Sequence, residues 1–236
     1  MKTKLKARSQ GFTLVELLVV IVIIAALAGL SAPVILKQRK AADRTEAINN
    51  VKQIGLSLQE FDAEYSVFPD NNTAQTVKEN TGTDLSFAGT FSNDYFRQLI
   101  AGAGLKSEKP FYCKTSYTKK PDDNFSGTHA LEKGEVGFGY IMATQSEGQS
   151  SSGTPSRPVV VAPLYQAQTD WTFDGEIYGD KAVILRLDNS ATALPIRTDN
   201  KHVSALEGKK LEDTGENTPW GTDMTPVLRA PEKRSN

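Results

Sequence analysis

The sequence predicts an α+β protein in which one long N-terminal helix packs on a head built mainly from an antiparallel β-sheet. The first half of this helix is long and apolar, because residues 17–36 form twenty consecutive uncharged positions, enough for a helix to cross about 30 Å of hydrocarbon. The second half is amphipathic, since apolar residues from Ala41 to Tyr65 recur every three or four positions. After Pro69, short apolar runs separated by turn residues are typical of strands.

Composition narrows the class of protein. The chain has 236 residues, 39% of them hydrophobic and 23% charged, which excludes a multi-span membrane protein and a disordered chain. Four of the 27 basic residues precede Gly11, which leaves 23 basic against 28 acidic residues after it. A mildly acidic remainder gives no reason to expect nucleic-acid binding. Cys113 is the single cysteine, so no intramolecular disulfide can form.

The N-terminal region has a basic segment followed by an apolar run, as a secretory signal peptide does. The apolar run exceeds the usual 7–15 residues or so of such signals, and no Ala-x-Ala-like cleavage site follows it. A plain signal anchor is a second interpretation. Basic residues on the two sides of the run nearly balance, however, so charge counting does not settle its orientation.

Glu16 is explained by neither interpretation. A carboxylate in an apolar membrane segment costs roughly 2.5–3.5 kcal/mol at the helix centre and less near an end. One alternative is that Glu16 lies in the first helical turn, where the macrodipole favours a negative charge. The other is a cationic partner, and residues 9–36 contain no Lys, Arg or His. Cleavage after Gly11 would create such a partner, the new α-amino group of Phe12.

The segment from Gln10 to Leu17, with its Gly11-Phe12 pair, Glu16 and the apolar run that follows, resembles the signal of type IV pilins and type II secretion pseudopilins. The resemblance covers about residues 1–69. It implies that a membrane peptidase cuts after Gly11 and methylates the amine of Phe12. It also implies that Glu16 governs assembly and that Pro33 lies where many family members have a helix-kinking proline.

The resemblance also implies partners and a location. The partners are identical or related pilin subunits, the prepilin peptidase, an inner-membrane assembly platform with its ATPase, and an outer-membrane secretin. The precursor would be a single-pass inner-membrane protein with a periplasmic head, and the filament would lie in the periplasm or on the cell surface. Pilus, pseudopilus and competence filament remain open, as does a minor pilin or tethered binding module that uses the loop 147–158 to recognise a surface, a glycan or DNA.

The expected organisation has five parts. Ala25 and Gly29 are small residues four apart, which allows close helix packing in lipid, and Pro33 should kink the helix. The helix should end before Pro69, because the residue preceding proline is disfavoured in the α region. The divisions are a leader over 1–11, a transmembrane or filament-core helix over 12–36, its amphipathic continuation over 37–66, a globular head over 67–206, and an extended or disordered tail over 207–236. Trp220 and Val227-Leu228 could dock this tail on the head.

Within the head we expect a helix over 93–103 that is capped by Ser92 or Asn93. Strands are expected over 136–143, 159–162, 171–178, 182–187 and 191–196, the last two joined by a turn at 188–190.

The sequence contains no recognisable catalytic or cofactor motif. His129 and His202 are far apart, and the glycine pattern around Gly102 does not match a phosphate-binding loop. The acidic turns 70–72 and 122–124 could offer oxygens to Ca²⁺, although neither matches an EF-hand. We therefore expect a structural subunit with no cofactor rather than an enzyme, with Ca²⁺ as the one ion for which ligands are present.

Overall fold

The computed structural model describes residues 12–127, 129–205 and 208–234, and the chain divides between Arg39 and Lys40 into two units. Helix α1 extends from Leu14 to Tyr65 and belongs to both. Among the described residues it is the one helix long and apolar enough to cross a membrane. Ser66, at φ 62°, follows its last residue, and the expected helix is confirmed.

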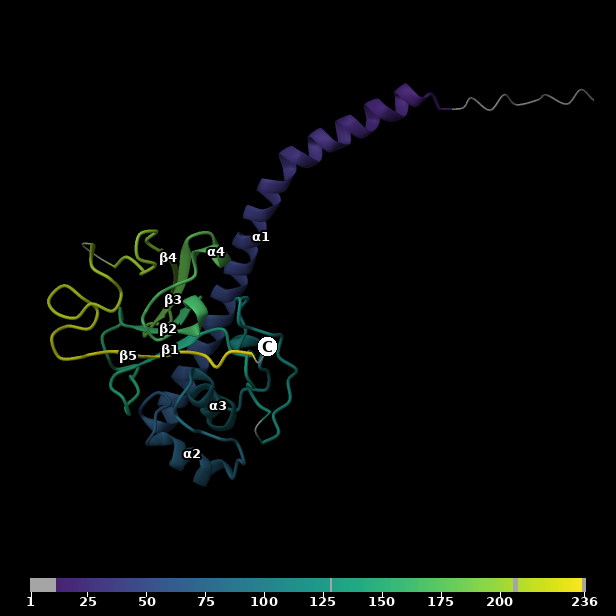
Figure 1. Ribbon diagram of the computed structural model, residues 1–236. Coiled ribbons are helices and arrows are strands. Elements are labelled where there is room, and N and C mark those ends of the chain that lie inside the picture. Colours follow the sequence, from purple (N-terminus) through teal and green to yellow (C-terminus); the bar gives the residue numbers. More distant parts are fainter. Residues whose placement is uncertain (1–11, 128, 206–207, 235–236) are drawn as a thin grey trace, which may run out of the picture. The chain divides into compact units, whose positions relative to one another are not determined.

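The second unit is an α+β head, as predicted. Its strands are β1 (Gly139–Met142), β2 (Pro158–Ala162), β3 (Lys181–Arg186), β4 (Ala191–Pro195) and β5 (Val227–Arg229). They form one antiparallel sheet in the order β4-β3-β2-β1-β5 (Figure 1). The expected hairpin joins β3 to β4, and Asn189 takes the left-handed conformation, with a φ of 61°, that its turn requires.

The sheet is buried on both faces, because successive side chains of a strand point to opposite sides. Tyr140 packs in a core with the C-terminal half of α1 and with α3 (Ser92–Gly102), whereas its neighbour Ile141 packs in a second core. The second core contains Phe173, Leu211 and Trp220, which cover the face away from α1. The uninterrupted apolar runs of β2 and β3 are typical of strands buried on both sides.

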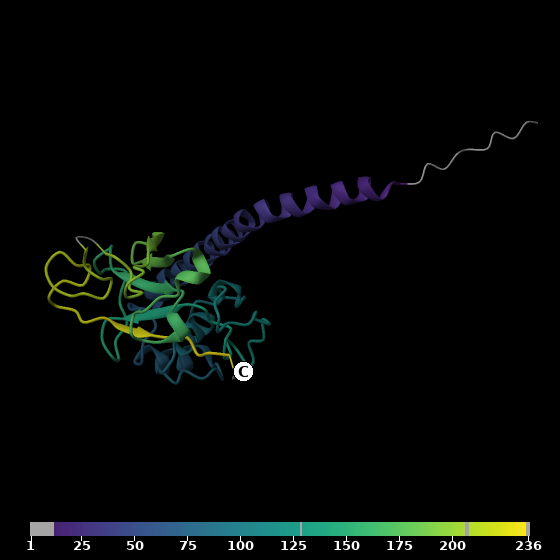
Figure 2. The same ribbon diagram turned by 45° about the horizontal axis from the view of Figure 1, so that its top comes forward.

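This second face explains why the segment expected as an extended or disordered tail docks on the head, through the Trp220 and Val227-Leu228 positions that the sequence offered for docking. The described residues 208–234 fold back onto the head, Trp220 is fully buried, and β5 pairs with β1. Figure 2 shows this yellow segment running beside the sheet. A sheet face without this cover would expose apolar side chains to water, so burial overrides the polar composition of the segment.

The strand expected over 171–178 is wrong. Phe173 forms an isolated bridge with Leu164, and Gly175–Tyr178 is a short helix, α4. The carboxylate of Asp174 accepts a hydrogen bond from the Glu176 backbone N–H, which caps the first turn of the helix. The capped helical turn is therefore more stable than the strand that the neighbouring aromatic residues would favour.

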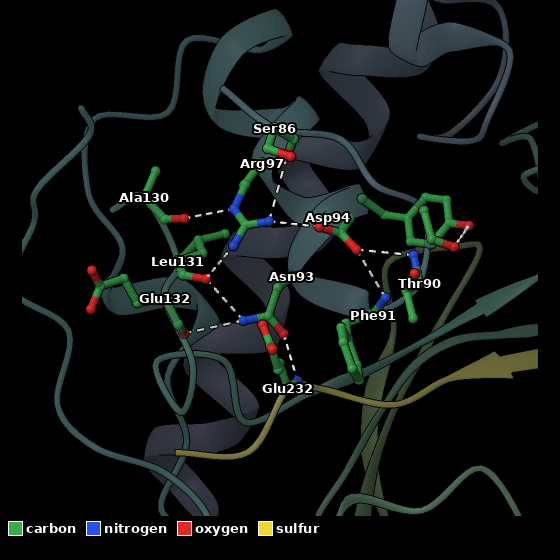
Figure 3. A network of polar contacts seen from close by, with 12 residues as sticks. Ser86, Thr90, Phe91, Asn93, Asp94, Arg97, Ala130, Leu131, Glu132 and Glu232 are labelled. Atoms are coloured by element: carbon green, nitrogen blue, oxygen red, sulfur yellow. Dashed lines mark hydrogen bonds and ion pairs between the residues drawn. The ribbon is translucent and has the colours of Figure 1, made fainter. Parts of the chain in front are cut away.

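Helix α3 begins one residue earlier than expected, with Phe91 at the cap position. The Asp94 carboxylate accepts hydrogen bonds from the backbone N–H groups of Thr90 and Phe91 (Figure 3). The side chains of the expected caps make tertiary bonds instead, Ser92 with the carbonyl of Phe138 and Asn93 with that of Leu131. The helix therefore takes its cap from inside its own first turn.

Three further elements were not expected. Helix α2 (Thr73–Thr81) lies beside α3, and two short 3₁₀ turns, η1 and η2, span Lys109–Phe111 and Tyr165–Ala167. Asp70 starts α2 by accepting hydrogen bonds from the backbone N–H groups of Asn72 and Thr73. The acidic turn 70–72 therefore has a structural task, because Asp70 holds the turn that leads into the helix.

Candidate assembly site on the N-terminal helix

The first turn of α1 is closed by two side chains. Thr13 Oγ1 accepts a hydrogen bond from the Glu16 backbone N–H at 3.2 Å, while Glu16 Oε2 accepts from the Thr13 backbone N–H at 2.8 Å and from Thr13 Oγ1 at 2.7 Å. This reciprocal pattern is a capping box, which satisfies N–H groups that the start of a helix leaves without partners. Glu16 thus has a local role within one chain, at the end of the helix where the macrodipole favours its charge.

The helix that Glu16 opens presents apolar side chains to its surroundings on every side. Within residues 14–36 of the helix, the exposed fractions of the large hydrophobic residues range from 48% at Val19 to 81% at Leu14. Soluble monomers rarely expose a contiguous apolar surface of more than a few hundred Å², and a larger one marks contact with a membrane or another protein. The N-terminal half of α1 therefore requires cover that the described residues of its own chain do not supply.

The small residues predicted to pack lie on this exposed surface. No atom lies within 4 Å of the place where a Cβ would stand on Gly29, and Ala25 is also exposed. Another helix could therefore approach this face closely, as small residues four apart allow. That packing remains a prediction.

The structure places the other predicted site residues as follows. Pro33 lies inside α1, and the helix is assigned on both sides of it, so the kink remains a prediction. Phe12 is exposed just before the helix. Gly11 lies outside the described residues.

Sequence reasoning missed one residue of this site, Thr13. Its signal was present, because Thr13-Leu14-Val15-Glu16 is the Ser/Thr-x-x-Glu pattern of a capping box directly before an apolar run. The interpretation of Glu16 as a residue of the first turn is supported by this contact. The other interpretation, in which the Glu16 carboxylate pairs with the amine of a neighbouring chain, involves a second chain and remains a prediction.

The remaining candidates for chemistry are dispersed over the head. His129 Nδ1 lies 2.6 Å from Glu132 and His202 Nδ1 lies 2.6 Å from Glu212, each a separate pair. Cys113 is buried, and the loss of solvation raises the pKa of its thiol to about 12, so it is not a reactive nucleophile. These groups do not converge on a common site.

The loop suggested for a binding module is anchored to the head. Gln149 is buried, and its side-chain amide donates to the carbonyls of Ile141 and Pro158. Ser151 donates a hydrogen bond to the Asp62 carboxylate on α1. The structure therefore provides no observation that singles this loop out as a recognition surface.

Two family models match the N-terminal part of the chain. Residues 6–32 match the prokaryotic N-terminal methylation motif, and residues 37–98 match a family described as protein of unknown function (DUF1559). The chain is 34% identical over 71 residues to the type II secretion system core protein G of Pectobacterium carotovorum subsp. carotovorum. That similarity covers 30% of this chain and 44% of the relative, so the match spans less than half of the relative's length. No solved structure matches.

The matched motif contains Gly11, Phe12 and Glu16 and most of the exposed apolar helix. The α+β architecture, a long helix followed by a five-stranded antiparallel sheet, is pilin-like. In its N-terminal part the chain is therefore similar to type IV pilins and pseudopilins.

Proposed function

We propose that this protein is a structural subunit of a type IV pilus-like filament, cleaved after Gly11 and assembled through its N-terminal helix. The observation that carries the proposal is the uncovered apolar surface of residues 14–36, which begins at the capped carboxylate of Glu16. Lipid covers this surface in the precursor, and the same helices of neighbouring subunits cover it in the filament. The head keeps its own two cores in both states.

Glu16 has a second role in this proposal. Cleavage after Gly11 creates the α-amino group of Phe12, a cation at the edge of a segment that holds no other basic side chain between residues 9 and 36. The carboxylate of one subunit pairs with this amine on its neighbour. In low-dielectric surroundings, the attraction within this pair offsets the free-energy cost of removing the two charges from water. Because the two groups must meet, the pair also fixes how far one subunit is shifted along the filament axis relative to its neighbour.

The proposed partners are the ones that assembly by this route requires. A prepilin peptidase removes the leader and methylates Phe12. An inner-membrane platform and its ATPase move subunits from the bilayer into a filament of identical or related chains, and an outer-membrane secretin surrounds it. The subunit starts as a single-pass inner-membrane protein with its head in the periplasm.

A type II secretion pseudopilin is the second candidate for the filament type. It is favoured by the relative, whose name is type II secretion system core protein G. A pseudopilus remains within the periplasm, whereas a pilus reaches the cell surface. Mechanical shearing of intact cells therefore distinguishes them, because it releases a surface fibre and leaves a periplasmic one behind.

Three variants separate the two roles of Glu16. Glu16→Gln keeps the capping box, in which Gln replaces Glu, but removes the charge. Thr13→Ala removes the cap and keeps the charge, and Glu16→Ala removes both. The readout is the amount of filament in sheared and periplasmic fractions, with subunit abundance in the membrane as the control for insertion.

We expect Glu16→Gln and Glu16→Ala to abolish assembly at normal membrane abundance, and Thr13→Ala to assemble. If Glu16→Gln forms filaments as well as the unchanged protein does, the carboxylate acts only as a helix cap and the proposed ion pair is wrong. Unchanged assembly by Glu16→Ala would contradict the proposed assembly route itself.

A further inference from the structure

Two exposed cations directly follow the apolar half of helix α1. Residues 17–36 carry no charge, and Lys37 and Arg39 come within three positions of their end. No Asp or Glu occurs from residue 17 to residue 42, so no carboxylate of this part of the helix balances them. Both residues are exposed, and the helix continues through them. This end of the apolar segment therefore carries a concentrated positive charge.

The chain itself makes no use of these two charges. No described residue forms a hydrogen bond or an ion pair with the side chain of Lys37 or Arg39. The next two cations of the helix differ, because Lys40 Nζ lies 3.3 Å from Glu176 Oε2 and Arg44 Nη1 donates to a backbone carbonyl of α4 at 3.0 Å. The cations further along the helix are thus occupied by the head, whereas those next to the apolar segment are available to a partner.

The spacing along α1 gives these cations a defined depth in a bilayer. A helix rises about 1.5 Å per residue, so Lys37 lies about 32 Å along the helix from Glu16, which matches about 30 Å of hydrocarbon. Arg39 lies about 3 Å further, inside a headgroup layer that is roughly 5–7 Å thick on each side. Successive residues turn by about 100°, so the two side chains leave the helix on nearly opposite sides. Lys37 and Arg39 therefore form a basic collar that can reach lipid phosphates around the helix.

Cleavage after Gly11 would make the basic collar the first basic side chains of the chain. Four basic residues precede Gly11, and residues 12–36 contain none. The precursor thus has basic side chains at both ends of its apolar segment, whereas the processed chain keeps them only at the end next to the head. Each Lys or Arg close to an anionic membrane surface adds attraction to it. Processing would therefore leave the collar as the main electrostatic contact between the subunit and lipid.

We propose that Lys37 and Arg39 bind the phosphates of anionic phospholipids at the periplasmic surface of the inner membrane. The inference rests on the proposed function, because it needs a precursor that spans the membrane with its head in the periplasm. The planar guanidinium of Arg39 suits two phosphate oxygens at once, and the ammonium of Lys37 acts as a compact charge. Zwitterionic lipids carry a cation beside the same phosphate, so the collar prefers anionic lipids. It thereby fixes the depth of the subunit in the bilayer.

The test reads lipid contact at the collar itself. Gln38→Cys places a thiol at an exposed position between the two cations, and a fluorophore attached there avoids Cys113, which is buried. The labelled full chain is reconstituted into vesicles of phosphatidylcholine and phosphatidylglycerol, and one or the other lipid carries a nitroxide quencher near the top of its acyl chain. Lipid attracted by the basic leader would lie across about 30 Å of hydrocarbon, too far away to quench this label.

Two double variants locate the contact. Lys37→Gln/Arg39→Gln removes the collar. Lys52→Gln/Lys106→Gln removes two exposed cations of the head that form no ion pair with a described residue, and it serves as the matched control. We expect phosphatidylglycerol to be enriched at least about fivefold over phosphatidylcholine near the label in the unchanged chain and in the control, which is the effect of about one cation at an anionic surface. The collar variant should show no enrichment.

The enrichment should also fall as salt is raised from about 0.1 M to 1 M, because the Debye length shortens from about 10 Å to about 3 Å. Equal quenching by the two lipids in the unchanged chain would overturn the inference, and so would an enrichment that the collar variant retains. Both outcomes leave the proposed function intact, because the label still contacts lipid. Absence of quenching by either lipid would mean that residue 38 does not reach the bilayer, which would contradict the membrane-spanning precursor as well.

Discussion

The two halves of helix α1 differ in apolar content, because residues 17–36 hold no charged side chain whereas residues 40–65 mix apolar with charged and polar positions, and their environments are opposite. In the half that belongs to the head, Val51, Ile54 and Phe61 are fully buried. In the N-terminal half, apolar residues such as Val20 and Ile24 remain about half exposed. The C-terminal segment of this continuous helix is thus buried in the core of the head, whereas its N-terminal segment leaves apolar side chains exposed.

The difference in environment follows from both the amount and the pattern of hydrophobicity in the two halves. In the head half, apolar residues recur every three or four positions with polar residues between them, so one stripe is buried and the rest is solvated. In the N-terminal half, apolar residues surround the helix, which is typical of a segment surrounded by lipid or other helices. Substitutions in the first segment should therefore alter the stability of the head, and those in the second should alter association.

The largest expected effect comes from Phe61→Ala, with Val20→Ala as the matched control. Phe61 is fully buried and stacks on Tyr65 with ring centroids 4.3 Å apart. Its truncation should lower the free energy of unfolding of the head by about 3–5 kcal/mol. Val20→Ala should change it by less than about 0.5 kcal/mol.

Urea unfolding of the full chain in detergent, followed by tryptophan fluorescence, measures both variants, because Trp171 and Trp220 belong to the head. Equal destabilisation by the two substitutions would mean that the two halves of α1 do not differ as described.

A smaller effect is expected from alanine at two glycines of the same helix. A Cβ on Gly55 would lie 2.0 Å from Asn189 Oδ1 and 3.1 Å from a methyl group of Leu185, whereas Gly29 has open space. Gly55→Ala should destabilise the head by about 1–2 kcal/mol, because overpacking of about 1–3 kcal/mol exceeds the gain of about 1 kcal/mol in helix propensity.

Gly29→Ala should leave the free energy of unfolding of the head unchanged. It should reduce filament yield, because the added methyl group keeps a neighbouring helix from packing closely on this face. The same urea titration and filament assay measure the pair. Normal assembly of the Gly29→Ala variant would mean that this face of the helix does not contact a neighbouring helix. A Gly55→Ala variant that is more stable than the unchanged protein would mean that the Asn189 side chain moves away without cost.

Much of the fold could be predicted because local patterns matched the final environment. The spacing of apolar residues from Ala41 to Tyr65 predicts which face of α1 is buried. The turn residues Asp188–Ser190 predict the hairpin between β3 and β4. Helix α2 gave little pattern, because Val77 is the one large apolar residue that it buries. Its start depends on Asp70, a residue that also occurs in ordinary turns.

The rest could not be read locally because it depends on tertiary structure. Trp220 and Leu211 lie in a polar stretch, and the reason for their burial is a sheet face formed by strands far away in sequence. Three carboxylates of the head, those of Glu108, Asp122 and Glu135, likewise lie close together only in the folded structure, and of these only Asp122 belonged to a recognised acidic turn. At the helix start, by contrast, both Thr13 and Glu16 were visible as a local motif.

The most direct test of the account is mass spectrometry of the N-terminal peptide from sheared surface material and from the membrane fraction. We predict a mature chain that begins with N-methylated Phe12, found in the sheared fraction if the filament is a pilus and in the cell-associated fraction if it is a pseudopilus. An intact leader beginning at Met1 in both fractions would contradict the proposed processing and the assembly mechanism that depends on it.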